Sequence, residues 1–217
     1  MITVLKMTED LHRTNFIFTA EDGNLLVTSA REAIAKFLTR HEKVIPQGLL
    51  SDARFEKKIG CFVTLKQNDE EKSLRGCIGF PEPVCKLSKA LTEASVSSAT
   101  QDPRFEPIGI EDLDSILVEV SILTSPSLIH VKSPRDLPRQ IDIGKDGLIM
   151  RWSFGSGLLL PQVATEQAWD AAEFLVNLSM KAGAPPDQWL VPGTQVLKFQ
   201  AQIFSEDQPF GLVRMLE

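Results

Sequence analysis

Leu74-Arg75-Gly76-Cys77-Ile78-Gly79 is the stretch of sequence that decides the fold. Its composition is typical of a β-strand, in which successive side chains point to opposite faces. We therefore expect Arg75 and Cys77 on one face, and Leu74 and Ile78 on the other. One face can pack into a core while the other lines a functional site.

Two glycines within a strand indicate that another backbone or a ligand comes close, because glycine otherwise weakens a strand. A guanidinium beside a thiol favours the thiolate, the form that acts as a nucleophile or as a ligand. We therefore take Cys77 as a candidate catalytic residue, and Arg75, Gly76 and Gly79 as candidate ligand-binding residues. The alternative for Cys77 is a small buried hydrophobic side chain.

Strands are expected on both sides of this stretch. Residues 60–66 should form a hairpin with it, and the small residues that end a helix from Val84 to Thr100 allow that helix to pack closely on the sheet. In the strand Ile116 to Leu123, Glu119 is a carboxylate among apolar side chains. Burying it bare is costly, so Glu119 should be paired or should line a wet cleft. It is our second catalytic candidate.

Three further residues are candidates for binding a ligand. Asp102 and Arg104 belong to a loop, since Pro103 keeps the residue before it out of the helical region. They can equally stabilise that loop. Arg75, in turn, can pair with Asp102 or Glu119 instead of binding an anionic ligand. Gln162 follows a strand that stops at a proline and can offer its amide to a ligand, or it can simply follow the strand's end.

The first helix is expected to begin at Ser29, because Glu32 three residues later completes a capping box. Arg31, Lys36 and Arg40 should then face outward.

The second half repeats the order of elements in the first. A hairpin is expected from 141–144 and 148–153, followed by a strand at 157–161, a helix capped by Thr165, and a last strand at 196–204. Two related halves, about 25–125 and 139–204, predict an α+β domain over residues 23–204. We expect an antiparallel, barrel-like or curved sheet, helices outside, and a cleft between two lobes. Residues 1–22 would be an N-terminal extension and 205–217 a C-terminal tail.

Composition limits the function. The chain has 217 residues, a net charge of −6 and three cysteines without a CxxC pair, so we expect no metal site, no cofactor and no disulfide framework. The acidic balance argues against nucleic acid as a partner. The sequence contains no apolar run long enough for a membrane span, which predicts a cytoplasmic protein without a membrane partner.

Several motifs together resemble the AMMECR family, named for the Alport syndrome, mental retardation, midface hypoplasia and elliptocytosis chromosomal region. The strand at 74–79 is similar to the family signature. The other motifs, in the family's order, are Gly60-Cys61-Phe62-Val63-Thr64-Leu65, Asp102-Pro103-Arg104-Phe105, Glu119-Val120-Ser121-Ile122-Leu123, Gly144-Lys145-Asp146-Gly147-Leu148, Gly157-Leu158-Leu159-Leu160-Pro161-Gln162-Val163 and Lys181-Ala182-Gly183 with Trp189.

The resemblance implies two α/β lobes around a groove. It also implies that this chain acts with a radical S-adenosylmethionine enzyme and a Memo-type protein. Two interpretations remain open: an enzyme component that uses Cys77 on a small anionic substrate, or an adaptor whose cleft binds a ligand or a partner protein without chemistry. A nucleic-acid-associated protein is the third and least favoured interpretation.

Overall fold

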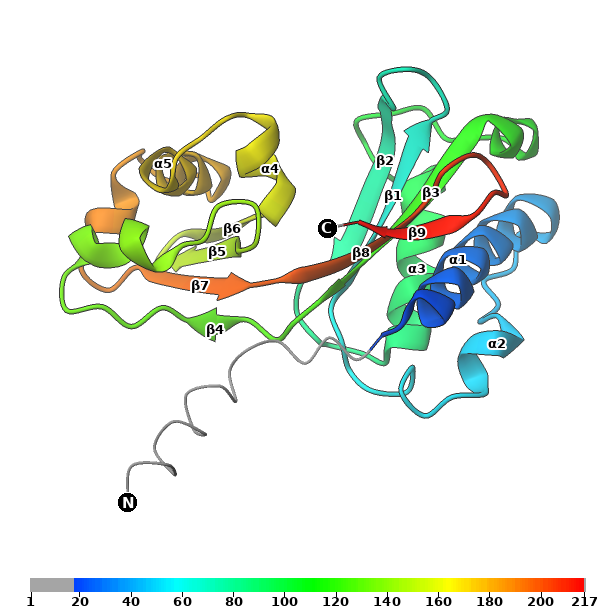
Figure 1. Cartoon of the computed structure of the whole chain (residues 1–217), viewed down its shortest axis with the longest axis horizontal. Helices are drawn as coiled ribbons and strands as arrows, with labels where there is room; N and C mark the ends of the chain where they lie inside the picture. The colour runs from blue at the N-terminus through cyan, green and yellow to red at the C-terminus, as the bar shows by residue number, and fades with distance from the viewer. Residues whose placement is uncertain (1–17, 217) are drawn as a thin grey trace.

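The computed structural model describes residues 18–216, which form two antiparallel sheets with helices packed on them (Figure 1). The five-stranded sheet has the order β2-β1-β3-β8-β9, with β1 (Cys61–Gln67), β2 (Leu74–Phe80), β3 (Ile116–Leu123), β8 (Ala201–Glu206) and β9 (Val213–Leu216). The four-stranded sheet has the order β4-β7-β5-β6, with β4 (Ser127–Leu128), β5 (Gly147–Trp152), β6 (Gly155–Leu159) and β7 (Gln195–Phe199).

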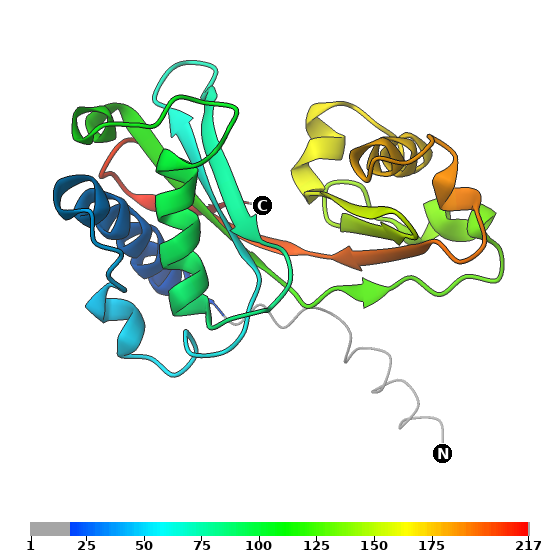
Figure 2. The ribbon, with the colours of Figure 1, turned by 180° about the vertical axis from the view of Figure 1, so that it is seen from behind.

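The longer helices cover one face of each sheet. Helices α1 (Ala20–Arg40) and α3 (Leu87–Thr100) lie on the five-stranded sheet, and α5 (Ala171–Lys181) lies on the four-stranded sheet (Figure 2). The short helical segments are α2 (Gln47–Leu50), η2 (Ile110–Ser115), η3 (Pro134–Gln140), α4 (Pro161–Glu166) and η4 (Gln188–Leu190). None of the helices in the described part of the chain is long and apolar enough to cross a membrane.

The predicted α+β class with antiparallel pairing is confirmed, but the strands do not join in one barrel-like or curved sheet. The expected single strand at 196–204 is divided at Gln200 into β7 and β8, which belong to different sheets. The chain therefore passes between the sheets twice, from β3 to β4 and from β7 to β8 (Figure 1).

The start of α1 differs from the prediction. Its N-cap is Thr19, whose hydroxyl accepts the backbone N–H of Asp22 while the Asp22 carboxylate accepts that of Thr19. Ser29 is buried inside the helix and caps nothing. Arg31, expected to face outward, is buried too, because it pairs with Glu206 of β8.

The hairpin of β1 and β2 is confirmed, and β2 contains the stretch from Leu74 to Gly79. Its glycine at 76 is explained by α3: a Cβ there would lie 2.1 Å from the carbonyl oxygen of Ser98. The small residues at the end of α3 therefore meet a strand position without a side chain. The sheet and the helix pack backbone to backbone at this point.

Details of the second half also differ. Residues 141–144 form no strand, and the hairpin consists of β5 and β6. Thr165 lies inside α4, while α5 is capped by Asp170, whose carboxylate accepts two backbone N–H groups. Residues 205–216, expected as a tail, supply the end of β8 and all of β9. Most of the expected extension at 1–22 lies outside the described residues.

Three groups of buried apolar side chains hold this arrangement together. The first lies between the five-stranded sheet and α1 and α3, and the second between the four-stranded sheet and α5. The third lies between the two sheets: it contains Leu123 of β3, Ile149 of β5 and Phe199 of β7, with Phe62 of β1 packed against it. This third group fixes one sheet against the other.

Candidate functional site

A cleft of about 810 Å³ is lined by residues of both sheets. The five-stranded sheet contributes side chains from β1, β2 and β3, and the opposite wall comes from β6, α4 and the end of α5. Five of the eight residues predicted from the sequence line it, namely Cys77, Asp102, Arg104, Glu119 and Gln162. They are separated by up to 85 positions in sequence, and folding brings them to one cavity.

The floor of the cleft contains a row of side chains across three neighbouring strands. Thr64 of β1 pairs with Cys77 of β2 on one side and with Glu119 of β3 on the other. The Thr64 hydroxyl donates to the Cys77 sulfur at 3.4 Å. Directly opposite residues on adjacent strands lie within side-chain contact distance. The hydroxyl therefore lies between the thiol and the carboxylate.

Burial raises the pKa of the Cys77 thiol above its ordinary value, although the Thr64 hydrogen bond and the charge of Arg104 act in the opposite direction. The thiol is therefore protonated at neutral pH. A depressed pKa, expected from a neighbouring guanidinium, is not found. Desolvation opposes the thiolate more strongly than its neighbours favour it.

The Glu119 side chain is almost fully buried, and its carboxylate has a charged partner. Lys66 of β1 pairs with it at 2.8 Å from Nζ to Oε2. Lys66 also lines the cleft, although we did not predict it as a site residue. The signal was present in the sequence, because Lys66 alternates with apolar residues in β1 on the same face as Thr64.

The side chains of Asp102 and Arg104 form hydrogen bonds with the backbone of Cys77 at the free edge of the sheet. The Asp102 carboxylate accepts the Cys77 N–H at 2.8 Å, and Arg104 donates to the Cys77 carbonyl at 3.3 Å. Arg104 also donates to both Asp102 oxygens, at 2.9 and 2.7 Å. Strand β2 is an edge of its sheet, so these two side chains satisfy backbone groups that a further strand would otherwise take.

Arg104 lowers the pKa of the Asp102 carboxyl from 3.8 to about 2, with the Cys77 N–H contributing. A carboxyl whose pKa is lower in the folded than in the unfolded state stabilises the fold above its ordinary pKa. That contribution disappears as the pH falls toward the folded value.

We expect Asp102→Asn to lower the free energy of unfolding by about 2 kcal/mol at pH 7, from the size of the pKa shift. The deficit should shrink between pH 4 and pH 2, as wild-type Asp102 becomes protonated. Urea unfolding of both proteins across this range measures it. Equal stability at pH 7, or a deficit that persists unchanged at pH 2, would contradict the assignment.

Arg75, Gly76 and Gly79 do not line the cleft. The expectation that Arg75 and Cys77 share one groove is wrong, because Lys66 pairs with Leu74 and Leu65 with Gly76, which leaves Arg75 as the extra residue of a β-bulge. Its guanidinium donates instead to the carbonyl of Glu106 at 3.1 Å.

Both glycines make room for protein atoms. Gly76 faces α3, as described above. A Cβ at Gly79 would lie 2.3 Å from the carbonyl oxygen of Cys61 and 2.4 Å from the ring of Phe62. These contacts account for the glycines without a ligand.

Gln162 approaches from the other sheet, in the first turn of α4. Its side-chain oxygen is buried and has no hydrogen-bond partner within residues 18–216. A buried acceptor without a partner is costly, so a donor group on a bound molecule would satisfy it.

The family model described as AMMECR1 matches residues 27–204, which contain all eight predicted site residues. The chain belongs to the AMMECR1 family. Its relatives include the protein MJ0810 of Methanocaldococcus jannaschii, 48% identical over 91% of this chain and 96% of the relative. A protein of Methanothermobacter thermautotrophicus is 51% identical over 86% of this chain and 95% of that protein.

A solved member of the family has the same fold. The crystal structure of the uncharacterized protein PH0010 from Pyrococcus horikoshii is similar with a TM-score of 0.87 and 43% identity, over 93% of this chain and 99% of the other. Family membership therefore rests on both sequence and structure. The names of these AMMECR1 relatives state no activity.

No group of three or more His, Cys, Asp and Glu side chains that could hold a metal ion occurs among the described residues. The chemically distinctive groups of the AMMECR1 cleft are therefore its thiol, its hydroxyl, its amide and its paired charges.

Proposed function

We propose that the cleft is the site of an enzyme component in which Cys77 reacts with a small anionic substrate. The observation that carries the proposal is the convergence of Cys77 and Gln162, from opposite walls, on one cavity. Its lining also contains four cations, Lys66, Lys72, Arg104 and Lys181, beside four carboxylates, Glu71, Asp102, Glu119 and Glu166. A substrate anion can replace a carboxylate as the partner of one of these cations, and a thiol in a cleft can attack a bound electrophile.

The row on the cleft floor suggests how the thiol becomes reactive. A substrate anion that pairs with Lys66 would free the Glu119 carboxylate. The Thr64 hydroxyl, which donates to the sulfur in this structure, then turns to accept the proton of Cys77 and to donate its own to Glu119. The thiolate displaces a leaving group from an electrophilic carbon of the substrate, and that group departs with the electron pair of the broken bond. On this proposal the raised pKa keeps the thiol unreactive until a substrate binds.

Two alkylating reagents of nearly equal size test this. We expect the ratio of the iodoacetate rate to the iodoacetamide rate at Cys77 to exceed that of N-acetylcysteine amide by about threefold or more, because the cleft attracts the anion. Mapping of the alkylated peptides by mass spectrometry measures the ratio. Lys181→Met should lower it, whereas Lys145→Met, which removes an exposed lysine outside the cleft, should not.

The proposal that the substrate is anionic would be refuted by a ratio of iodoacetate to iodoacetamide rates no higher than that of the reference thiol. A ratio that falls equally in the two lysine variants would refute it as well.

A non-catalytic adaptor is the second candidate. The raised pKa of Cys77, together with the structural use of Asp102 and Arg104, favours it. In that case Cys77→Ser, which keeps the shape of the side chain, should preserve partner binding while Gln162→Ala weakens it. An enzyme component should lose its reaction in Cys77→Ser.

The partners proposed from the family resemblance are a radical S-adenosylmethionine enzyme and a Memo-type protein. Co-elution of the purified chains in gel filtration tests this. The cytoplasmic location stays a prediction.

A further inference from the structure

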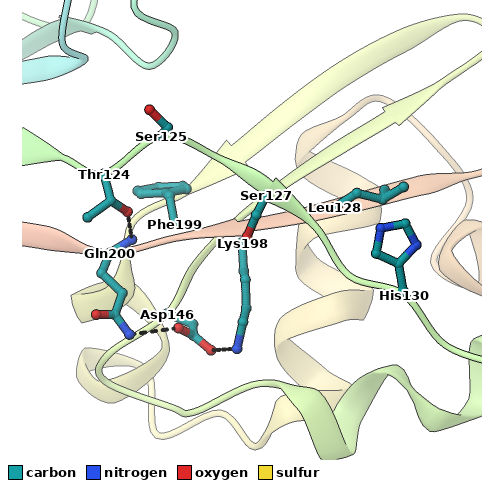
Figure 3. A pocket seen from close by; sticks show the side chains of 9 residues that line it. All are labelled: Thr124, Ser125, Ser127, Leu128, His130, Asp146, Lys198, Phe199 and Gln200. Carbon is teal, nitrogen blue, oxygen red and sulfur yellow. Dashed lines mark hydrogen bonds and ion pairs between the residues drawn. The ribbon is translucent and has the colours of Figure 1, made fainter. Parts of the chain in front are cut away.

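The two walls of the cleft belong to different sheets, which are held against each other. Where the two chain connections between the sheets meet, the Gln200 N–H donates to the Thr124 hydroxyl at 2.8 Å (Figure 3). The Gln200 side-chain amide and the Lys198 ammonium both donate to the buried Asp146 carboxylate, at 3.2 and 3.0 Å. These contacts, with the apolar group between the sheets, fix one wall relative to the other. A ligand that bridges the cleft must therefore offer a suitable group to each wall.

Lys72 is a cation on the wall formed by the five-stranded sheet. On this wall Lys66 pairs with Glu119, and Arg104 pairs with Asp102. The Lys72 ammonium lines the cleft at the end of the hairpin of β1 and β2, and it has neither an ion pair nor a hydrogen bond within residues 18–216. An anion can therefore bind Lys72 without first displacing a carboxylate.

The backbone at Lys72 adopts a conformation that favours glycine. Its φ is +50°, in the left-handed region, where a side chain costs energy. The turn is held by Asp69, whose carbonyl accepts the Lys72 N–H at 3.2 Å and whose carboxylate accepts the Ser73 N–H at 3.0 Å. The Lys72 ammonium, without a partner among the described residues, adds nothing to this turn. Strained residues of this kind cluster at ligand-binding sites.

Lys66 lies at the same end of the cleft as Lys72. Lys66 is opposite Leu74 in the hairpin, and the Gln67 N–H donates to the Ser73 carbonyl at 2.7 Å, so Lys72 lies where the two strands part. A carboxylate has two acceptor oxygens and can bind both ammonium groups. An anion that is already bound to Lys72 is then in place to replace Glu119 as the partner of Lys66.

The opposite wall offers hydrogen-bond acceptors. The buried Oε1 of Gln162 has no partner within residues 18–216. Glu166, one helical turn later in α4, also lines the cleft and has no ion-pair partner in the same range. Residues four apart in a helix share a face. A second anionic group at this wall would be repelled by Glu166, whereas an N–H group would satisfy the Gln162 oxygen.

We propose that the ligand of the cleft is a small carboxylate that also carries an N–H donor, such as an amino acid with an acylated nitrogen. Its carboxylate binds Lys72 and Lys66, and its N–H donates to Gln162 Oε1 on the opposite wall. Lys181 shares the wall of Gln162, so a ligand that bridges the cleft uses Lys72 for its anion. This ligand class rests on the proposed function for the choice of the cleft, but its binding needs no reaction at Cys77.

Three probes of nearly the same size separate the two contacts. N-acetylglycine has the carboxylate and the N–H, acetoxyacetate has an ester oxygen in place of the N–H, and N-acetylglycinamide has a neutral amide in place of the carboxylate. In titrations of the full ¹⁵N-labelled chain, N-acetylglycine should cause saturable amide shifts within residues 72–78 and 158–166. It should bind about fivefold more tightly than acetoxyacetate and about tenfold or more tightly than N-acetylglycinamide.

Two variants should each remove one of these preferences. Gln162→Met, which keeps the length of the side chain, should abolish the preference for N-acetylglycine over acetoxyacetate and preserve the preference over N-acetylglycinamide. Lys72→Met should lower the second preference by about fivefold and preserve the first. Lys145→Met removes an exposed lysine outside the cleft and is the matched control, which should bind the three probes as the wild type does.

Lys72→Gly separates a binding role of this lysine from a structural one. It should lose the carboxylate preference as Lys72→Met does, but its melting temperature should not fall, because glycine adopts the left-handed conformation without strain. A lower melting temperature in Lys72→Gly would show that the lysine stabilises the fold and would overturn the proposal.

The titrations can overturn the proposal in three further ways: shifts with N-acetylglycine that are absent, equal affinities for the three probes, or preferences that Gln162→Met and Lys72→Met leave unchanged. The proposed reaction fails separately. If the predicted preferences are found while alkylating reagents do not reach Cys77, the reaction is refuted and the assignment of the ligand stands.

Discussion

Replacement of Arg31 by methionine is expected to lower the free energy of unfolding by about 3–5 kcal/mol, the cost of breaking a buried ion pair. The guanidinium donates to both Glu206 oxygens, at 2.8 and 2.5 Å, and to the carbonyls of Leu113 and Ile116. Methionine fills much of the space but leaves the Glu206 carboxylate buried, with the Val118 N–H as its only remaining donor among residues 18–216. Urea unfolding followed by circular dichroism measures the loss.

Lys36→Met is the matched control on the same helix, because Lys36 pairs with Glu32 at a half-exposed position. It should cost no more than about 0.5 kcal/mol. The double variant Arg31→Met/Glu206→Gln should recover much of the stability, since it removes the unpaired charge. A loss below about 1 kcal/mol in Arg31→Met would show that this pair does not hold α1 to the sheet.

Gly76→Ala is expected to cost about 3 kcal/mol or more, at the upper end of the range for overpacked sites. The added Cβ would lie 2.1 Å from the carbonyl oxygen of Ser98, a backbone atom that cannot move without shifting α3. Thermal unfolding should show the loss as a lower melting temperature.

Gly48→Ala is the control for the glycine prediction. A Cβ at Gly48 would meet only the end of the flexible Leu25 side chain, so its effect should be small. If the two glycine variants unfold at the same temperature, close packing of α3 on β2 is not what requires glycine at position 76.

The sequence predicted those parts of the fold that depend on local periodicity. Strand β3 shows it best: the run of apolar side chains from Ile116 to Leu123 indicated the strand, and the single carboxylate within it, Glu119, indicated the cleft. The hairpin of β1 and β2 followed from two such strands on either side of a polar loop.

Parts of the fold that depend on distant partners were missed. Arg31 lies on what looked like the outer face of a helix, and only Glu206, 175 positions away, explains its burial. The bulge that removes Arg75 from the cleft depends on the pairing of β2 with β1. The division of the last strand at Gln200 depends on which sheet each part joins. None of these has a signal in the adjacent sequence.

The sequence indicated several residues that line the cleft, but it did not indicate which contacts each of them makes. Cys77, Glu119 and Gln162 line one cleft. Asp102 and Arg104 line it too, yet they use their hydrogen bonds on the backbone of Cys77. Lys66 was overlooked because a lysine near the end of a strand looks like an ordinary solvent-exposed residue.

The Cys77 thiol opens into the cleft, and burial keeps it protonated there. The most direct measurement is the rate of iodoacetamide modification of each cysteine in the native chain as a function of pH, resolved by peptide mass spectrometry. Cys61, which is fully buried, should stay unmodified. Cys77 should react, with a rate that rises to a midpoint above the ordinary thiol value of 9.0. A Cys77 as inert as Cys61, or a midpoint below that value, would contradict the account.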